Sequence, residues 1–129
     1  MTSPKPDTYD DRYLEYFAFF NRREFWQCHE VLEDLWHDCA SGERYFYQGL
    51  IQFAAAFHLL WRRNMRGFER LLSLASLHLE PYPALHHGLD LGVVRQSIDY
   101  WSQRALHRSP LEILKFEDEY IPRLELSTD

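Results

Sequence analysis

The stretch RYFYQGLIQFAAAFHLLWR, residues 44–62, decides the fold class of this chain. Its 17 inner residues, 45–61, carry no charge, and their apolar side chains would point in every direction around a helix. A helix that is apolar all round is buried. A membrane span needs about 20 such residues and does not readily accept Gln48 and Gln52 in its interior. The stretch therefore predicts a buried central helix over about residues 43–63.

Apolar residues recur at helical spacing on both sides of this stretch, and no alternation typical of strands is present. The predicted flanking helices cover about residues 9–20, 22–38, 68–79 and 91–105. Together with the central helix they predict an all-α fold, a compact bundle of five to six helices.

Local signals predict where the helices begin. Asn21 with Glu24 matches a capping pair, which predicts that the second helix starts there. Asn64 and Gly67 mark a short turn, and Asp90 can cap the fifth helix. A cap, a first-turn proline and an N3 acid predict a short sixth helix at residues 109–112.

Length and composition predict a single domain. The chain has 129 residues, 46% of them hydrophobic, and a formal net charge of -6, which excludes a disordered chain and argues against a nonspecific nucleic-acid binder. We expect a flexible leader over residues 1–8, a helical domain over 9–117 and an acidic irregular tail over 118–129.

The two cysteines and the N-terminal residues predict a cytoplasmic protein. Cys28 and Cys39 lie 11 residues apart in one predicted helix, about 16 Å at ~1.5 Å per residue, which is too far for a disulfide. Free thiols are typical of reducing compartments. Residues 1–11 are rich in Pro and Asp and do not form a secretory signal, and no membrane association is expected.

An ordered set of residues resembles the prokaryotic domain-of-unknown-function 309 family. The family pattern of a His, a Glu four residues later and a Trp three further is matched by His29, Glu33 and Trp36. The other matching positions are Asn21, Glu30, Leu32, Phe46, Gln48, Gly49, Leu50, Ile51, Gln52, Ala54, His58, Asn64, Gly67, Leu71 and Asp90. The resemblance covers about residues 13–100 and implies an all-helical fold, with no established activity. Phe68 departs from the pattern, since a small residue is expected after Gly67.

His29 and Glu33 are the first candidate site residues. Four residues apart on a helix, they share one face at the edge of its apolar arc. A carboxylate beside an imidazole can orient a general base, and both can ligate a metal. A hydrogen-bonded structural pair at the rim of the core is the more frequent outcome of such a pattern. A metalloprotease helix would carry a second His where Glu33 stands.

A second polar pair lies inside the central helix. Gln48 and Gln52 bring amide groups that need partners when buried. We expect them to face His29 and Glu33 and to form one internal polar cluster, with Trp36 as the wall of a ligand pocket or as a core anchor.

Two basic groups complete the candidates. Arg62, Arg63, Arg66 and Arg70 lie within nine residues and predict an anion site, a docking surface for an acidic partner or a solvated face. His86 and His87 are adjacent, so their side chains would diverge in an extended segment and make a poor chelate; no role is assigned to them.

Three functional readings follow. The first is a small helical domain whose cluster of His29, Glu33, Trp36, Gln48 and Gln52 binds a small polar ligand or, through His29 and Glu33, a divalent metal. The second is a noncatalytic module that associates with itself through its arginines and aromatic residues. The third, a metal-dependent hydrolase, lacks an evident third ligand. No cofactor is required by the sequence, and no complete catalytic constellation is recognisable.

Overall fold

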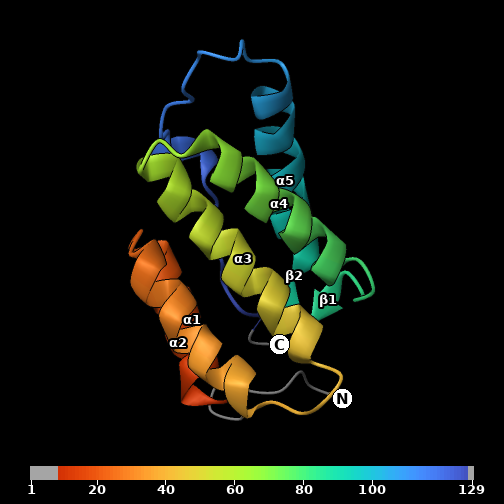
Figure 1. Cartoon of the computed structure of the whole chain (residues 1–129). Coiled ribbons are helices and arrows are strands. Elements are labelled where there is room, and N and C mark those ends of the chain that lie inside the picture. The colour runs from red at the N-terminus through yellow and green to blue at the C-terminus, as the bar shows by residue number, and fades with distance from the viewer. Residues whose placement is uncertain (1–8, 128–129) are drawn as a thin grey trace.

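The structure, a computed structural model that describes residues 9–127, is a bundle of α-helices (Figure 1). Within that range it contains five α-helices and one two-stranded hairpin, which confirms the predicted all-α class. The helices are α1 (Asp11–Asn21), α2 (Phe25–Asp38), α3 (Arg44–Trp61), α4 (Met65–Leu79) and α5 (Leu91–Leu106). The predicted leader over residues 1–8 lies outside the described residues.

The central helix is α3, as predicted. It lies between α2 and α4 and packs against both (Figure 1). Its buried residues are Phe46, Gly49, Leu50, Ile51, Phe53, Ala54, Ala56, Phe57 and Leu60. Gly49 lets α4 approach closely, because a Cβ at that position would stand 2.6 Å from Cγ of Leu79. In the core, two aromatic rings of α3, Phe53 and Phe57, pack on rings from three other helices. The partner rings are Phe20 of α1, Phe68 of α4 and Trp101 of α5.

Side-chain caps fix the start of α4 and α5. The Asn64 carboxamide oxygen accepts from the Gly67 amide at 2.9 Å, and the Asp90 carboxylate accepts from the Gly92 amide at 2.8 Å. Such caps satisfy amide groups that a helix leaves without partners at its first turn. The predicted cap at Asp90 is confirmed.

The predicted cap at Asn21 is wrong. Asn21 is the last residue of α1, and its carboxamide pairs with the backbone of Leu124, donating at 2.9 Å and accepting at 2.8 Å. The two-sided hydrogen bond to an extended segment takes the place of the capping interaction. Helix α2 begins four residues later at Phe25, after Arg23 takes a positive φ of 64°.

A short hairpin, absent from the sequence prediction, joins α4 to α5. Strands β1 (Leu85–His86) and β2 (Leu89–Asp90) pair antiparallel, with His86 opposite Leu89. The two residues between them, His87 and Gly88, have φ of 48° and 74°, the left-handed conformation that two-residue hairpin turns require. Two residues per strand are too few for an alternation pattern to show in the sequence.

No sixth helix forms at residues 109–112. The Glu112 amide bonds to the Ser109 carbonyl at 3.0 Å, which makes a single turn, and the chain then runs on without regular structure as far as a 3-10 turn at Asp118–Tyr120. The segment packs on the bundle, because Leu114, Ile121 and Leu124 are buried in the core.

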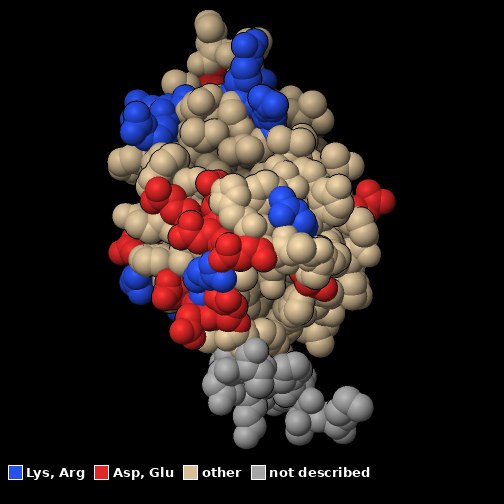
Figure 2. Space-filling model, turned by 60° about the horizontal axis from the view of Figure 1, so that its bottom comes forward, with Lys and Arg blue, Asp and Glu red and all other residues tan. Residues whose placement is uncertain are grey.

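Charged residues are unevenly spread over the surface. In the view of Figure 2, a group of Lys and Arg lies at one end of the face, and Asp and Glu gather in another region that also contains some Lys or Arg. Among the described residues, no helix combines the length and hydropathy that crossing a membrane would take.

Candidate metal centre

The structure places the predicted pair His29 and Glu33 at the surface of α2. The His29 Nε2 and Glu33 Oε2 atoms are 3.9 Å apart, and the side chains are 14% and 48% exposed. The other ring nitrogen of His29 lies 2.7 Å from the Trp26 carbonyl oxygen. The imidazole is therefore held mainly by the backbone of its own helix.

The two glutamines do not join this pair. Gln52 Oε1 lies 2.7 Å from Nδ1 of His78 on α4, and the Gln48 side chain makes no hydrogen bond within the described chain. Gln52 thus uses the side of α3 that faces α4, whereas α2 packs elsewhere on α3. The expected internal cluster of four polar side chains is not assembled.

Trp36 and the arginine group also have defined places. The Arg44 guanidinium lies over the Trp36 ring at 4.3 Å from its centre, a cation–π contact that ties the end of α2 to the start of α3. The arginines Arg62, Arg63, Arg66 and Arg70 are all exposed, and within residues 9–127 none of their side chains makes a hydrogen bond or an ion pair.

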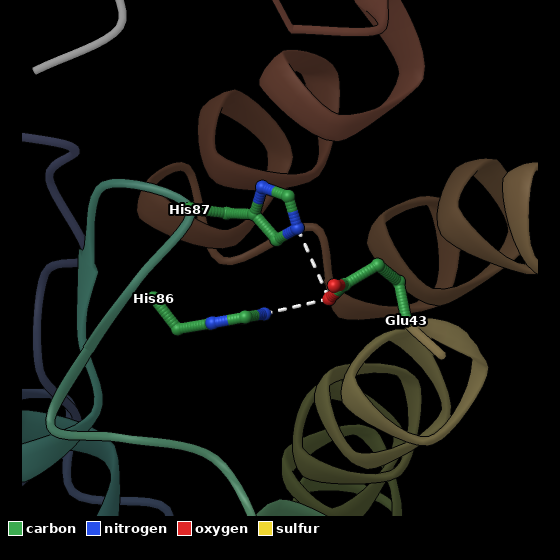
Figure 3. Close-up of side chains that lie close together, drawn as sticks. All are labelled: Glu43, His86 and His87. Atoms are coloured by element: carbon green, nitrogen blue, oxygen red, sulfur yellow. Dashed lines mark hydrogen bonds and ion pairs between the residues drawn. The ribbon is translucent and has the colours of Figure 1, made fainter. Parts of the chain in front are cut away.

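Three other side chains converge at the N-terminal end of α3. The carboxylate of Glu43 meets the imidazoles of His86 and His87 (Figure 3), with its Oε2 atom 2.6 Å from Nε2 of His86 and 3.0 Å from Nε2 of His87. One donor atom from each residue lies within 4.8 Å of the other two. All three side chains are partly exposed, at 20–33%.

Local structure explains why these residues meet. Glu43 stands at the N-cap position of α3 without bonding to that helix through its side chain, so its carboxylate is free to reach the hairpin. His86 ends β1, and the left-handed backbone at His87 turns its imidazole toward the same carboxylate. The Tyr13 hydroxyl donates to the His87 carbonyl at 2.8 Å and fixes the turn against α1.

Aromatic rings hold both imidazoles. Phe46 lies 4.7 Å from the His86 ring and 5.6 Å from the His87 ring, and Tyr82 packs on His86 at 4.9 Å. The Tyr47 ring stacks on His87 at 6.4 Å. Packing of this kind restricts the rotamers of the two imidazoles and pre-organises their nitrogen atoms.

The electrostatics favour an ionised Glu43. Burial acts to raise the pKa of its carboxyl group, but the hydrogen bond and the charge of His86, together with His87, outweigh burial and hold the pKa below its ordinary value. Burial, with smaller contributions from Cys39, Glu43 and Asp10, raises the pKa of the Tyr47 phenol to about 12. The site therefore presents an anionic oxygen beside two nitrogen donors and neutral phenols.

The prediction that the side chains of His86 and His87 diverge is wrong, since both imidazoles reach the Glu43 carboxylate. It assumed an extended segment, in which successive side chains point to opposite faces, but His87 lies in the turn of the hairpin and not in a strand. Glu43 was missed altogether. The pair His87–Gly88, between His86 and Leu89, signals a tight turn, but nothing local connects it with Glu43, 43 residues before His86.

The donor set suits a first-row transition metal. Imidazole nitrogen favours zinc, copper, iron and nickel, whereas calcium and magnesium favour sites built wholly from oxygen. Two His and one Glu also form the protein ligands of known zinc sites that keep a fourth position for water. In the tetrahedral geometry of zinc, donor atoms stand roughly 3.3 Å apart. To admit the ion, the Glu43 oxygen would have to move away from the His86 nitrogen by about 0.7 Å and from the His87 nitrogen by about 0.3 Å.

Comparison with known proteins identifies a family match and two similar proteins. Residues 13–71 match the family described as Domain of unknown function (DUF309). The chain is similar to the uncharacterized protein YpuF of Bacillus subtilis, at 33% identity over 88 residues, which are 65% of this chain and 51% of that protein. It is also similar to an uncharacterized protein of Aquifex aeolicus, at 28% identity over 81 residues, which are 62% of this chain and 24% of that protein.

The chain thus spans about half of the Bacillus protein and a smaller share of the Aquifex protein. The family match includes Glu43 and ends before His86, so it covers α1 to α3 and the first half of α4 but not the hairpin. The family resemblance seen in the sequence is confirmed over residues 13–71, which match the family model of the domain of unknown function DUF309.

Proposed function

We propose that this protein is a small helical domain that binds a divalent transition metal through Glu43, His86 and His87. The observation that carries the proposal is the approach of one carboxylate oxygen to two imidazole Nε2 atoms, at 2.6 and 3.0 Å. The donors come from two elements that are remote in the sequence, and aromatic packing holds both rings. Zinc is the metal that this combination of nitrogen and carboxylate donors fits best.

The hydrogen-bonding state of His87 supports the proposal. Its Nε2 atom is buried and lies 3.0 Å from Glu43, but the geometry does not make a hydrogen bond. A buried nitrogen without a hydrogen-bond partner has a lone pair or a proton to satisfy. Coordination of a metal by that nitrogen would satisfy it.

We also propose that the protein resides in a reducing compartment, the cytoplasm. Cys28 and Cys39 are both free thiols, and neither belongs to the proposed ligand set. The three protein donors leave the fourth tetrahedral position to water or to an oxygen of a small ligand.

The test is a titration of the chelator-treated protein with zinc, in which isothermal titration calorimetry measures the stoichiometry and the affinity. We expect one zinc ion per chain in the wild type. Replacement of a ligand, in His86→Ala, His87→Ala or Glu43→Gln, should weaken binding by more than the ~10–100-fold that loss of an outer-shell partner costs. Cobalt as a spectroscopic substitute should give the visible absorption of a tetrahedral site, which the variants lose.

Two further variants serve as controls. His107, exposed at the C-cap of α5, is a surface imidazole remote from the site, so His107→Ala should bind zinc as the wild type does. His29→Ala tests the pair predicted from the sequence. Loss of binding in His29→Ala alone would move the metal to α2, and an absence of stoichiometric zinc from the wild type would overturn the proposal.

A further inference from the structure

Two exposed tryptophans, Trp26 on α2 and Trp61 on α3, pack on His58 near the C-terminal end of α3, away from the proposed metal site. Trp26 is 49% and Trp61 is 62% exposed, and the ring of His58 lies between them, 5.0 Å from the first and 6.3 Å from the second. Two adjoining hollows of about 530 and 640 Å³ share Trp61 and Phe116 in their linings. We refer to Trp26, His58, Trp61 and Phe116 as the tryptophan surface. Contiguous exposed aromatic surface marks interaction sites in soluble proteins.

A basic group adjoins one side of the tryptophan surface. Arg63 and Lys115 line the same hollow as Trp61, and Arg62, Arg66 and Arg70 follow along the turn and the first half of α4. All five are exposed, and no acidic partner is bound to any of them within residues 9–127. Arg66 stands in the first turn of α4, where the helix dipole disfavours a cation, so local helix stability does not explain its presence.

An acidic stripe adjoins the other side. Trp26, Glu30 and Glu33 share one face of α2, because residues four and seven positions apart lie on the same side of a helix. Asp34 lies beside them, and all three acids are exposed. Within the described chain, the basic side chain that contacts these acids is His29, whose Nε2 atom lies 3.9 Å from Glu33 Oε2. The tryptophan surface thus separates acids on α2 from arginines on the α3–α4 turn.

We infer that a second copy of the chain covers this surface in a two-fold symmetric dimer. In such a dimer each contact occurs twice, so the acidic stripe of each protomer meets the basic group of its partner while the tryptophans lie near the axis. Tryptophan and arginine are the residues that contribute most to the centres of protein interfaces, and complementary charge fixes orientation. One surface that carries both charges around an apolar centre is complementary to itself.

The same observations count against a polyanionic partner. A nucleic acid or an acidic peptide would be attracted by the arginines and repelled by Glu30, Glu33 and Asp34 across the tryptophans, on a chain of net charge -6. A second copy alone matches both halves of the surface.

The test is sedimentation velocity over a concentration series, in the presence of a chelator so that metal-mediated association plays no part. The wild type should sediment as a dimer that dissociates on dilution. Trp61→Ala should raise the dissociation constant by at least about tenfold. Leu85→Ala, which truncates an exposed apolar residue of the hairpin at the other end of α3, should leave it unchanged.

Charge reversal gives the decisive comparison. A basic-reversed variant, Arg63→Glu with Arg66→Glu, and an acid-reversed variant, Glu30→Arg with Glu33→Arg, should each be monomeric alone. An equal mixture of the two should form a heterodimer, since every like-charge contact is then replaced by an opposite-charge contact. Glu80→Arg, an exposed reversal at the C-cap of α4, is the matched control and should leave the dimer intact.

A wild type that remains monomeric at every concentration would refute the inference. So would a dimer that survives both reversals, or folded single variants, checked by circular dichroism, that fail to associate when mixed. None of these results affects the metal titration, so the inference and the proposed function fail or hold separately.

Discussion

The Tyr82 hydroxyl donates a hydrogen bond to the Gly42 carbonyl at 2.6 Å and accepts one from the Phe46 amide at 3.0 Å. One phenol thereby ties the chain between α4 and the hairpin to the first turn of α3. Its ring also packs on His86 at 4.9 Å. Tyr82 therefore holds together the two segments that supply the proposed metal ligands, although it is not a ligand itself.

Replacement of Tyr82 by Phe should weaken zinc binding without abolishing it. The variant keeps the ring and loses both hydrogen bonds, so the free energy of unfolding should fall by about 1–2 kcal/mol. Urea denaturation measures the stability and calorimetry the affinity. Tyr45→Phe is the matched control, because the Tyr45 ring is exposed and stacks on His78, and its hydroxyl makes no hydrogen bond in the described structure. Equal zinc affinity in Tyr82→Phe and the wild type would show that the tether has no effect on the site.

Glu43 should make the stability of the metal-free protein depend on pH in acid. The pKa of Glu43 is lowered by its histidine neighbours from the ordinary 4.5, so its carboxylate is stabilised in the folded state. A group with a depressed pKa contributes stability that is present above the unfolded value and is lost as the pH falls through the folded value. The difference in unfolding free energy between wild type and Glu43→Gln should therefore be largest above pH 4.5 and shrink below it.

Urea denaturation at a series of acid pH values, with chelator present, measures this difference. His86→Ala removes the shorter of the two contacts to Glu43 and should reduce the effect of Glu43→Gln. A difference that stays constant as the pH falls would contradict the proposed ion pair.

Replacement of Gly49 on α3 should destabilise the fold. A Cβ there would meet Leu79 Cγ at 2.6 Å and Cδ2 at 2.7 Å, so α3 and α4 would have to separate or Leu79 leave its rotamer. We expect Gly49→Ala to lower the free energy of unfolding by roughly 1–3 kcal/mol, as overpacked cores do. Gly42→Ala is the control, since a Cβ at Gly42 meets nothing within 4 Å. Equal unfolding midpoints for the two variants would show that α3 and α4 accommodate the added methyl group without loss of stability.

The two cysteines should differ in reactivity. Burial raises the pKa of the Cys28 thiol, which also donates to the Tyr16 carbonyl at 3.2 Å, whereas Cys39 is half-buried beside Ser41. Because the thiolate is the reactive form, an aromatic disulfide reagent should label one thiol per folded chain and a second one at least roughly a hundredfold more slowly. Cys39→Ser should remove the fast phase. A fast phase that survives in Cys39→Ser would mean that Cys28 is accessible.

The helical frame could be predicted because its signals are local. A run of 17 uncharged residues, apolar on all sides of a helix, favours a buried helix, and the predicted range of about 43–63 agrees with Arg44–Trp61. The Asp90 cap is equally local. The cap at Asn21 failed because a distant backbone segment at Leu124 competes for the same carboxamide. The helix predicted at residues 109–112 failed because Leu114 enters the core from an extended chain, which ends the turn after one hydrogen bond.

The candidate site could not be predicted because it depends on which faces of the helices meet. The sequence places Gln52 and His29 on regular helical positions, but it does not say that Gln52 faces α4, where it bonds to His78. The approach of Glu43 to His87 depends on a left-handed turn residue and on the position of the hairpin against α1 and α3. The spacing of residues along the sequence does not show which residues from distant segments come into contact.

Because Glu43 and His86 are far apart along the chain, the proposed metal would also act as a cross-link that stabilises the fold. A cation held between them would close a loop of 43 residues in a protein whose two cysteines are both free. Closing a loop of that length removes unfolded-chain entropy equivalent to about 4 kcal/mol, by the chain-entropy relation that applies to disulfides. Unlike a disulfide, this staple would open without any change of redox state. The supply of free metal, and not the oxidising power of the surroundings, would then set the contribution of this cross-link to the free energy of unfolding.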